Sequence, residues 1–172
     1  LSDDRHFFGE IYEGMLKELQ SAGKSGEFYT PRAVTQFMTD IINPKLGEKI
    51  LDPACGSGSF LIGAYQYLID YHIDYYTQEK HLQKSKKDKL IRETKDGYIL
   101  SIQEKQRILK NNIFGVDIDQ QAVEVAKFSL LLKLMESESK EIETRILSSG
   151  EIGYQGDFQE HGLGYANTIK IL

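Results

Sequence analysis

The spacing of apolar residues along the chain predicts amphipathic helices that alternate with short strands. In four segments apolar side chains recur every three or four positions, which places them on one face of a helix. Two short apolar runs, at residues 50–51 and 113–118, predict strands. This alternation predicts an α/β fold with parallel strands joined by a right-handed crossover. The four stripes are Phe8, Ile11, Tyr12, Met15 and Leu19; Val34, Phe37, Met38 and Ile41; Leu61, Ala64, Tyr65 and Leu68; and Val123, Ala126, Leu130 and Leu134.

A glycine-containing loop follows the first predicted strand. Residues 50–61 have the sequence Ile-Leu-Asp-Pro-Ala-Cys-Gly-Ser-Gly-Ser-Phe-Leu, so Asp52 lies at the end of the strand. Gly56 and Gly58 let a ligand approach the backbone closely, and in open α/β sheets ligands bind at this edge. The lysine of a phosphate-binding loop is absent, and Leu61 replaces the third glycine of the dinucleotide pattern. A carboxylate beside such a loop suits a cationic ligand such as S-adenosylmethionine; the alternative is a simple strand-to-helix turn.

Two further segments favour a nucleoside ligand. Residues 113–119, Ile-Phe-Gly-Val-Asp-Ile-Asp, form a second strand that ends in acids, where such folds bind ribose hydroxyls. Residues 26–31, Gly-Glu-Phe-Tyr-Thr-Pro, precede a helix expected to end near Ile42. Thr30 is predicted to cap this helix and Pro31 to take its first position.

These three segments, in this order, resemble the amino-proximal part of adenine-specific DNA methyltransferases. The group comprises the modification subunits of type I restriction-modification systems and related fused restriction–modification enzymes. The resemblance covers about residues 7–135 and implies a partial Rossmann-like S-adenosylmethionine-dependent methyltransferase fold, with a helical N-terminal segment and a helical insertion. It also implies a bacterial, cytoplasmic enzyme that acts on DNA together with a specificity subunit or target-recognition domain and a restriction subunit or domain.

The resemblance assigns nine residues to the cofactor S-adenosyl-L-methionine. Tyr29 and Thr30 are expected to border its methionine part and Asp117 to bind its ribose hydroxyls. Ile118 is expected to lie against the adenine. Asp52, Ala54 and Gly56 of the glycine loop are expected to hold its amino acid end, and Ser57 and Gly58 of the same loop are expected to bind the cofactor.

One family motif is absent. The catalytic Asn-Pro-Pro-aromatic sequence does not occur, and Asn43-Pro44-Lys45 precedes the glycine loop and is predicted to be a turn. No catalytic residue is therefore assigned. The first residue is Leu and the chain stops at Leu172, so we expect a fragment that holds the cofactor and does not methylate by itself.

Composition is typical of one soluble domain. The chain has 172 residues, 40% of them hydrophobic, and it contains no apolar run near the ~20 residues of a membrane span. A single cysteine, Cys55, suits a reducing cytoplasm and packing against small residues, and the scattered histidines give no metal-ligand spacing. A net charge of −5 argues against this segment gripping DNA alone. We expect a helical segment at residues 1–25 and the cofactor-binding domain at 26–172.

The sequence allows alternative interpretations of two regions, a predicted insertion and the segment around Asp157. About sixty residues separate Asp52 from Asp117, which indicates an insertion at about residues 74–100, followed by a helix at 102–110. Its basic residues, with Tyr71, Tyr75 and Tyr76 nearby, predict either contact with DNA or a partner subunit, or a solvated helical hairpin. Asp157 resembles an adenine-binding acid, but its glycine-rich surroundings favour a loop before a possible strand at 168–172. The insertion's basic residues are Lys84, Lys86, Lys87, Lys89 and Arg92.

Two other functions stay open at the level of sequence. One is a methyltransferase for another substrate, such as protein glutamine. The other is a non-catalytic module that keeps the fold for assembly with partner subunits.

Overall fold

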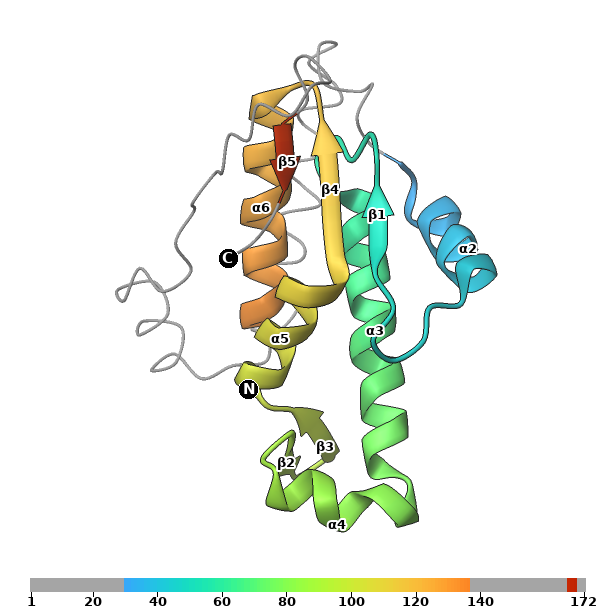
Figure 1. The fold of residues 1–172 in the computed structure, drawn as a ribbon, viewed down its shortest axis with the longest axis vertical. Coiled ribbons are helices and arrows are strands. Elements are labelled where there is room, and N and C mark those ends of the chain that lie inside the picture. Colours follow the sequence, from blue (N-terminus) through green and yellow to red (C-terminus); the bar gives the residue numbers. More distant parts are fainter. Residues whose placement is uncertain (1–29, 137–166, 170–172) are drawn as a thin grey trace, which may run out of the picture.

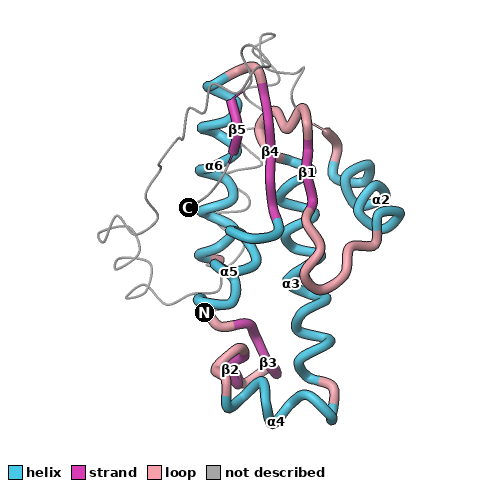
Figure 2. The backbone as a smooth tube through the Cα atoms, in the orientation of Figure 1, coloured by secondary structure: helices cyan, strands magenta, loops and turns pink. Residues whose placement is uncertain are grey.

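The computed structural model describes residues 30–136 and 167–169, and Figures 1 and 2 show their arrangement. The elements alternate as expected for an α/β fold. In chain order they are α2 (Arg32–Ile42), β1 (Ile50–Asp52), α3 (Ser59–Thr77), α4 (Glu79–Lys87), β2 (Ile91–Thr94), β3 (Gly97–Leu100), α5 (Ile102–Asn112), β4 (Ile113–Asp117), α6 (Gln120–Met135) and β5 (Asn167–Ile169).

The predicted parallel pairing of the first two strands is confirmed. β1 and β4 are parallel neighbours, with Ile50 opposite Ile113 and Asp52 opposite Gly115. Their carboxyl ends therefore lie side by side at one edge of the sheet (Figure 1). Within the range predicted as a possible strand, 168–172, the described residues belong to β5 (Asn167–Ile169), which pairs antiparallel with the other side of β4. The alternation of strands and helices did not predict that direction.

The core lies between the sheet and the two long helices behind it, α3 and α6 (Figure 1). The apolar stripes predicted for both helices are confirmed as buried, and Leu61, Ala64, Tyr65 and Leu68 are all 0% exposed. Gly115 in β4 gives these side chains room, because a Cβ there would come within 2.7 Å of Leu61 Cδ1. This packing fixes the start of α3, and with it the loop that precedes it.

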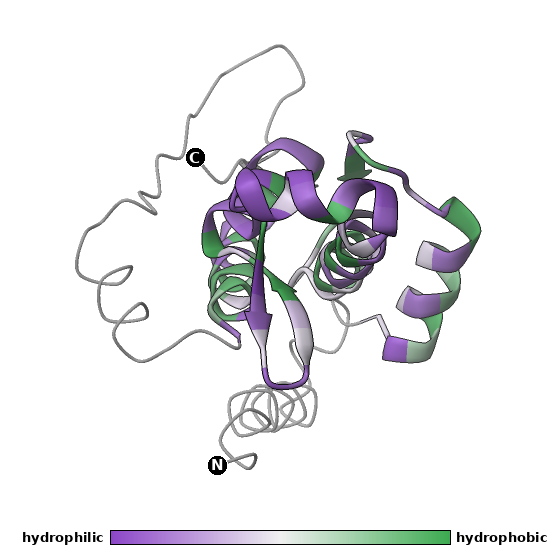
Figure 3. Cartoon of the chain, turned by 90° about the horizontal axis from the view of Figure 1, so that it is seen from below, coloured by the Kyte–Doolittle hydropathy of each residue, from purple (hydrophilic) through white to green (hydrophobic). Residues whose placement is uncertain are grey.

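Helix α2 packs through its polar side. Thr35 and Thr39 are buried, and Thr35 faces Gly63 of α3, whereas Phe37 is 64% exposed. Figure 3 shows the hydrophobic residues of α2 at the outer side of the described part of the chain. The apolar stripe that identified this helix is therefore not its contact with α3. The stripe consists of Val34, Phe37, Met38 and Ile41.

The two ends of α2 differ in how well they were predicted. The N-cap is Pro31 and the helix begins at Arg32, with no side-chain hydrogen bond at the cap, so the predicted cap by Thr30 is wrong. Pro31 takes an extended conformation, which shifts the start by one residue. The predicted turn at residues 43–45 is confirmed: Asn43 ends the helix in the left-handed region, and its N–H donates to the carbonyl of Thr39.

The insertion is a helix followed by a β-hairpin. Residues 79–87 form α4, but β2 and β3 are antiparallel, with Thr94 opposite Gly97. The expectation of a wholly helical insertion is therefore wrong. Lys95 and Asp96 form the hairpin turn, and Gly97, which starts β3, adopts a φ of 127° that other residues avoid. The helix expected at 102–110 is confirmed as α5.

Several predictions lie outside the described residues. They are the helix at 5–20, Tyr29 and Asp157. Within residues 30–136 and 167–169, no helix combines the length and the hydropathy that crossing a bilayer requires.

Candidate functional site

Two carboxylates meet at the carboxyl ends of β1 and β4. Asp52 ends β1 and is half-buried, and Asp117 ends β4 and is 6% exposed. Partial burial raises the pKa of the Asp52 carboxyl above its usual 3.8; the hydrogen bond from Ala54 N opposes this shift, and the charge of Asp117 adds to it. The two acids are therefore close enough to influence each other. The structure brings both predicted residues to one edge of the sheet.

The glycine loop between β1 and α3 is bonded to the end of β4. Cys55 N–H donates to the carbonyl of Val116 at 3.0 Å, and Gly56 N–H donates to Asp117 Oδ2 at 2.8 Å. Gly58 N–H closes a turn onto the carbonyl of Cys55 at 2.8 Å. Residues far apart in sequence thus determine the shape of the loop together.

Gly58 is required where the loop passes α6. Its φ is +85°, and a Cβ would lie 2.8 Å from Ala126 Cβ. Gly56 is also left-handed, with a φ of +51°. Both glycines therefore adopt backbone conformations that other residues rarely tolerate.

The remaining residues predicted to bind the ligand differ in their exposure to solvent. Ala54 is exposed at the loop and Ser57 is buried in it, with Ser57 Oγ 3.4 Å from Ser59 Oγ. Ile118 follows β4 and is 78% exposed. Thr30 is half-buried just before α2, and no hydrogen bond within the described part of the chain joins it to the loop.

Asp119 has a role that the sequence reasoning did not assign. It is the N-cap of α6, and its side chain accepts a hydrogen bond from Gln121 N–H at 2.8 Å. The signal was available, because an aspartate directly before an amphipathic helix is a preferred cap.

Cys55 is a packing residue. Its side chain is 4% exposed and lies against Gly115. Burial, with smaller contributions from the charges of Asp52 and Asp117, raises the pKa of the thiol to about 12. A neutral, buried thiol is a poor nucleophile, which agrees with the expectation from sequence.

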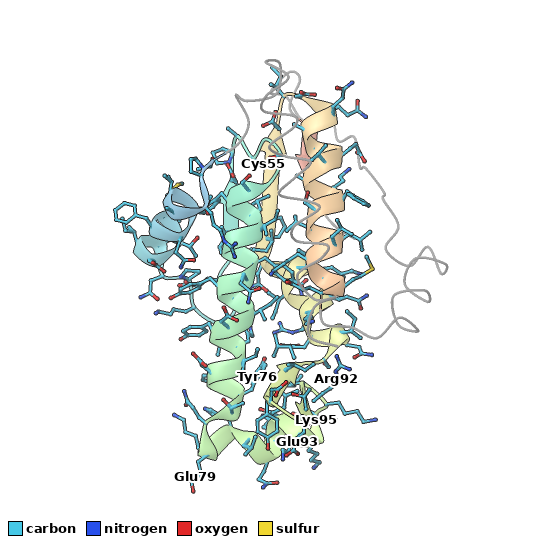
Figure 4. All side chains as sticks on the ribbon, turned by 180° about the vertical axis from the view of Figure 1, so that it is seen from behind. Cys55, Tyr76, Glu79, Arg92, Glu93 and Lys95 are labelled. Atoms are coloured by element: carbon cyan, nitrogen blue, oxygen red, sulfur yellow. The ribbon has the colours of Figure 1, made fainter. Side chains whose placement is uncertain are left out.

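Two of the tyrosines near the insertion make contacts within the fold. Tyr76 donates to Glu104 Oε1 at 2.7 Å, and Tyr75 stacks on His81 with ring centroids 4.2 Å apart. Figure 4 shows Cys55 near one end of α3, with Tyr76 and Arg92 toward the other. The insertion therefore lies away from the two carboxylates. Within the ranges that the structure describes, no group of three potential metal ligands occurs.

Comparison with known proteins gives a consistent result. The family described as N-6 DNA Methylase matches residues 3–149. The chain is 56% identical over 82 residues to the type I restriction enzyme EcoEI methylase subunit of Escherichia coli, a match that covers 48% of this chain and 17% of that protein. It is 42% identical over 96 residues to the type II restriction enzyme and methyltransferase RM.Eco57I of Escherichia coli, covering 56% and 9%.

A solved structure is also similar. It is the modification subunit of a putative type I restriction enzyme from Vibrio vulnificus YJ016, 31% identical, with a TM-score of 0.49 and coverage of 79% of this chain and 23% of that one. The chain thus spans less than a quarter of the length of each of these three relatives.

Proposed function

The chain belongs to the N-6 DNA methylase family, and from that premise we propose that it is the donor-binding part of a site-specific DNA methyltransferase. The parent protein transfers a methyl group to the exocyclic amino group of adenine within a restriction-modification system. The observation that carries the proposal is the pair of carboxylates at adjacent strand ends, with the glycine loop bonded between them.

The residues at this edge fit S-adenosyl-L-methionine. Asp52 is half-buried, and no lysine or arginine of the described ranges forms a salt bridge with it. A cationic ammonium group beside Asp52 favours its charged form, which burial and Asp117 disfavour. The exposed Ile118 offers an apolar surface to an adenine ring. The family resemblance likewise assigns Asp52 to the amino acid end of the cofactor and Ile118 to its adenine.

The chain's contribution to the reaction is to bind and orient the donor. S-adenosylmethionine supplies an activated methyl group on a sulfonium, so the protein's task is to align it with the acceptor nitrogen. The residues that hold the flipped base, an Asn-Pro-Pro-aromatic motif in the resembled family, do not occur in this chain. Target positioning therefore belongs to the rest of the parent protein.

The proposed partners follow from the relatives. Two of them are named as type I methylase or modification subunits and one as a combined restriction enzyme and methyltransferase. We therefore propose that the parent protein acts on DNA. We also propose that it works with a specificity subunit or target-recognition domain and with a restriction subunit or domain. The net charge of −5 supports the proposal that another part of the parent protein binds the DNA duplex.

Calorimetric titration with S-adenosylmethionine tests the proposal. We expect the wild type to bind and Asp52→Ala to weaken binding at least tenfold, because the ammonium group loses its carboxylate. Asp96→Ala is the matched control: it also removes one negative charge, but from the exposed turn of the insertion, and it should leave the affinity unchanged.

The opposite outcome has a clear meaning. If folded wild type shows no heat of binding at millimolar S-adenosylmethionine, the chain does not hold the donor. The non-catalytic assembly module then becomes the better description.

A further inference from the structure

We propose that the outward side of α4 is a DNA contact, in which Lys80, Lys84 and Lys87 bind phosphates of the duplex outside the target base. The inference goes beyond the proposed function, because α4 lies at the other end of α3 from the glycine loop (Figure 1). It takes its ligand, DNA, from that function. Lysines on phosphates add affinity without reading bases, so this contact supplements the grip of another part of the parent protein.

The insertion is a basic region in an acidic chain. Residues 79–97 contain seven lysines and arginines and four acids, although the net charge of the whole chain is −5. Six of these cations are exposed lysines, and Arg92 is half-buried. A local excess of positive charge is the electrostatic feature that attracts nucleic acid. The overall charge of the chain therefore does not describe this end of the molecule.

Helix α4 has two different sides. Ser85 is 2% exposed and Leu82 packs against the core, so this side faces the protein. Lys80, Lys84 and Lys87 follow one another at spacings of four and three residues, which places them together on the other side, and all three are exposed. Within the described ranges no acid forms a salt bridge with these three residues, the lysine face. Their ammonium groups are therefore available to an external anion.

The lysine face is unfavourable for the helix that carries it. Lys80 and Lys84 are like charges four residues apart, and Lys84 and Lys87 are like charges three residues apart, and such pairs destabilise a helix. Acids at these spacings would stabilise α4 and keep it equally soluble. A bound polyanion removes the repulsion, which a face exposed only to water does not explain.

Lys89 shows a second local cost. Its φ is +54°, its N–H donates to the carbonyl of Lys86 at 3.1 Å, and Leu90 N–H donates to the carbonyl of Ser85 at 3.0 Å. Helices that end in this way usually have glycine at the left-handed position, because a side chain is strained there. The sequence instead has one more exposed cation, two residues after Lys87.

The surface of the insertion suits DNA better than a protein partner. No large hydrophobic residue of 79–97 is exposed, whereas the centre of a protein–protein interface is apolar. Interfaces with DNA are polar and strongly positive. The insertion therefore offers charge without the apolar surface that a protein partner would bury.

The dimensions also agree with a duplex. Lys80 and Lys87 are separated by about 10 Å along the helix, and a duplex carries about six phosphate charges over that length. The 19 residues of α3 extend about 28 Å, which corresponds to about eight base pairs. The phosphates bound by the lysine face are therefore separate from the target base.

Fluorescence anisotropy with a labelled duplex of about 20 base pairs tests the contact at about 50 and 200 mM salt. We expect Lys80→Gln, Lys84→Gln and Lys87→Gln combined, the α4 variant, to bind at least tenfold more weakly than the wild type at the lower salt concentration. The loss of three phosphate contacts also reduces the slope of log affinity against log salt by about 2.7. Arginine at the same three positions keeps the charges and should preserve the affinity.

A matched control carries Lys45→Gln, Lys49→Gln and Lys110→Gln, which remove the same charge from exposed positions outside the insertion. Its affinity and salt slope should match the wild type, with circular dichroism showing that every variant is folded. An equal loss in the control and the α4 variant would mean that net charge governs binding, and the inference fails. It also fails if the wild type does not bind the duplex at the lower salt concentration.

Competition with poly-L-glutamate distinguishes DNA from an acidic protein. At equal concentrations of negative charge we expect the duplex to bind more tightly. Tighter binding of the polypeptide, lost in the α4 variant, assigns the lysine face to an acidic protein and overturns the inference. The titration with S-adenosylmethionine is independent of these measurements, so a failed DNA contact leaves the proposed function intact, and a failed titration leaves the DNA result intact.

Discussion

At the scale of single residues, the glycine loop depends on having no side chain at position 58. Gly58 has both a left-handed φ and no room for a Cβ, because Ala126 lies 2.8 Å from where it would be. We expect Gly58→Ala to lower the free energy of unfolding by about 2–4 kcal/mol, from backbone strain and overpacking combined. Urea denaturation measures this change.

Gly47 provides the matched control for Gly58. Its φ is +80°, but a Cβ there would meet nothing within 4 Å. Gly47→Ala therefore carries the backbone strain alone, about 1 kcal/mol. Equal losses in the two variants would show that contact with α6 does not restrain the loop.

At the scale of elements, the contact between α2 and α3 leaves space for one more methyl group. Gly63 lies inside α3, and a Cβ there would be 3.5 Å from Thr35 Oγ1, an ordinary van der Waals contact. We expect Gly63→Ala to stabilise the protein by about 0.5–1 kcal/mol, because alanine favours the helix and fits. A rise in the thermal midpoint measures this gain, and a fall would show that α2 approaches α3 more closely than described.

The elements also show what the sequence could predict. The strands and the glycine loop were predictable because their signals are local: an apolar run, then an acid, then glycines. The periodicity located α2 but not its packing face, since Thr35 and Thr39, not the apolar stripe, contact α3. The hairpin at β2 and β3 was missed because the lysines around it dominate its composition.

Only part of the site could be predicted from the sequence, because one of its contacts joins residues that are far apart in the chain. Asp52 and Asp117 follow directly from the ends of two strands. The bond between Asp117 and Gly56 does not, because it joins residues 61 positions apart and depends on the register of β1 and β4. Tyr29 stays a prediction, since it lies outside the described residues.

At the scale of the whole molecule, a hydrogen bond to the buried Glu104 joins α3 to α5. Glu104 is 2% exposed and accepts hydrogen bonds from Tyr76 and from Arg107. Burial by itself raises the pKa of the Glu104 carboxyl, but these bonds outweigh it and hold the pKa below its usual 4.5. The stabilisation is therefore fully present above pH 4.5 and is lost as the pH falls through the folded-state pKa.

Glu104→Gln tests this pH dependence. We expect a loss of about 1–2 kcal/mol at pH 7, which shrinks below pH 4.5 as the wild-type carboxylate becomes protonated. Urea midpoints at pH 7, 5 and 4 follow the change. Glu93→Gln alters the exposed partner of the exposed Lys86 in the same chemical way and should cost less than 0.5 kcal/mol at every pH. A pH-independent loss in Glu104→Gln would contradict the assignment.

The length of α3 separates the two ends of the molecule. Its 19 residues extend about 28 Å, from Ser59 beside the glycine loop to Thr77, where the insertion starts (Figure 1). The turn at Lys95 and Asp96 is exposed. A fluorophore or an affinity tag attached there would lie at the opposite end of α3 from the glycine loop (Figure 4), so the protein can be labelled or immobilised through this turn without altering the two carboxylates.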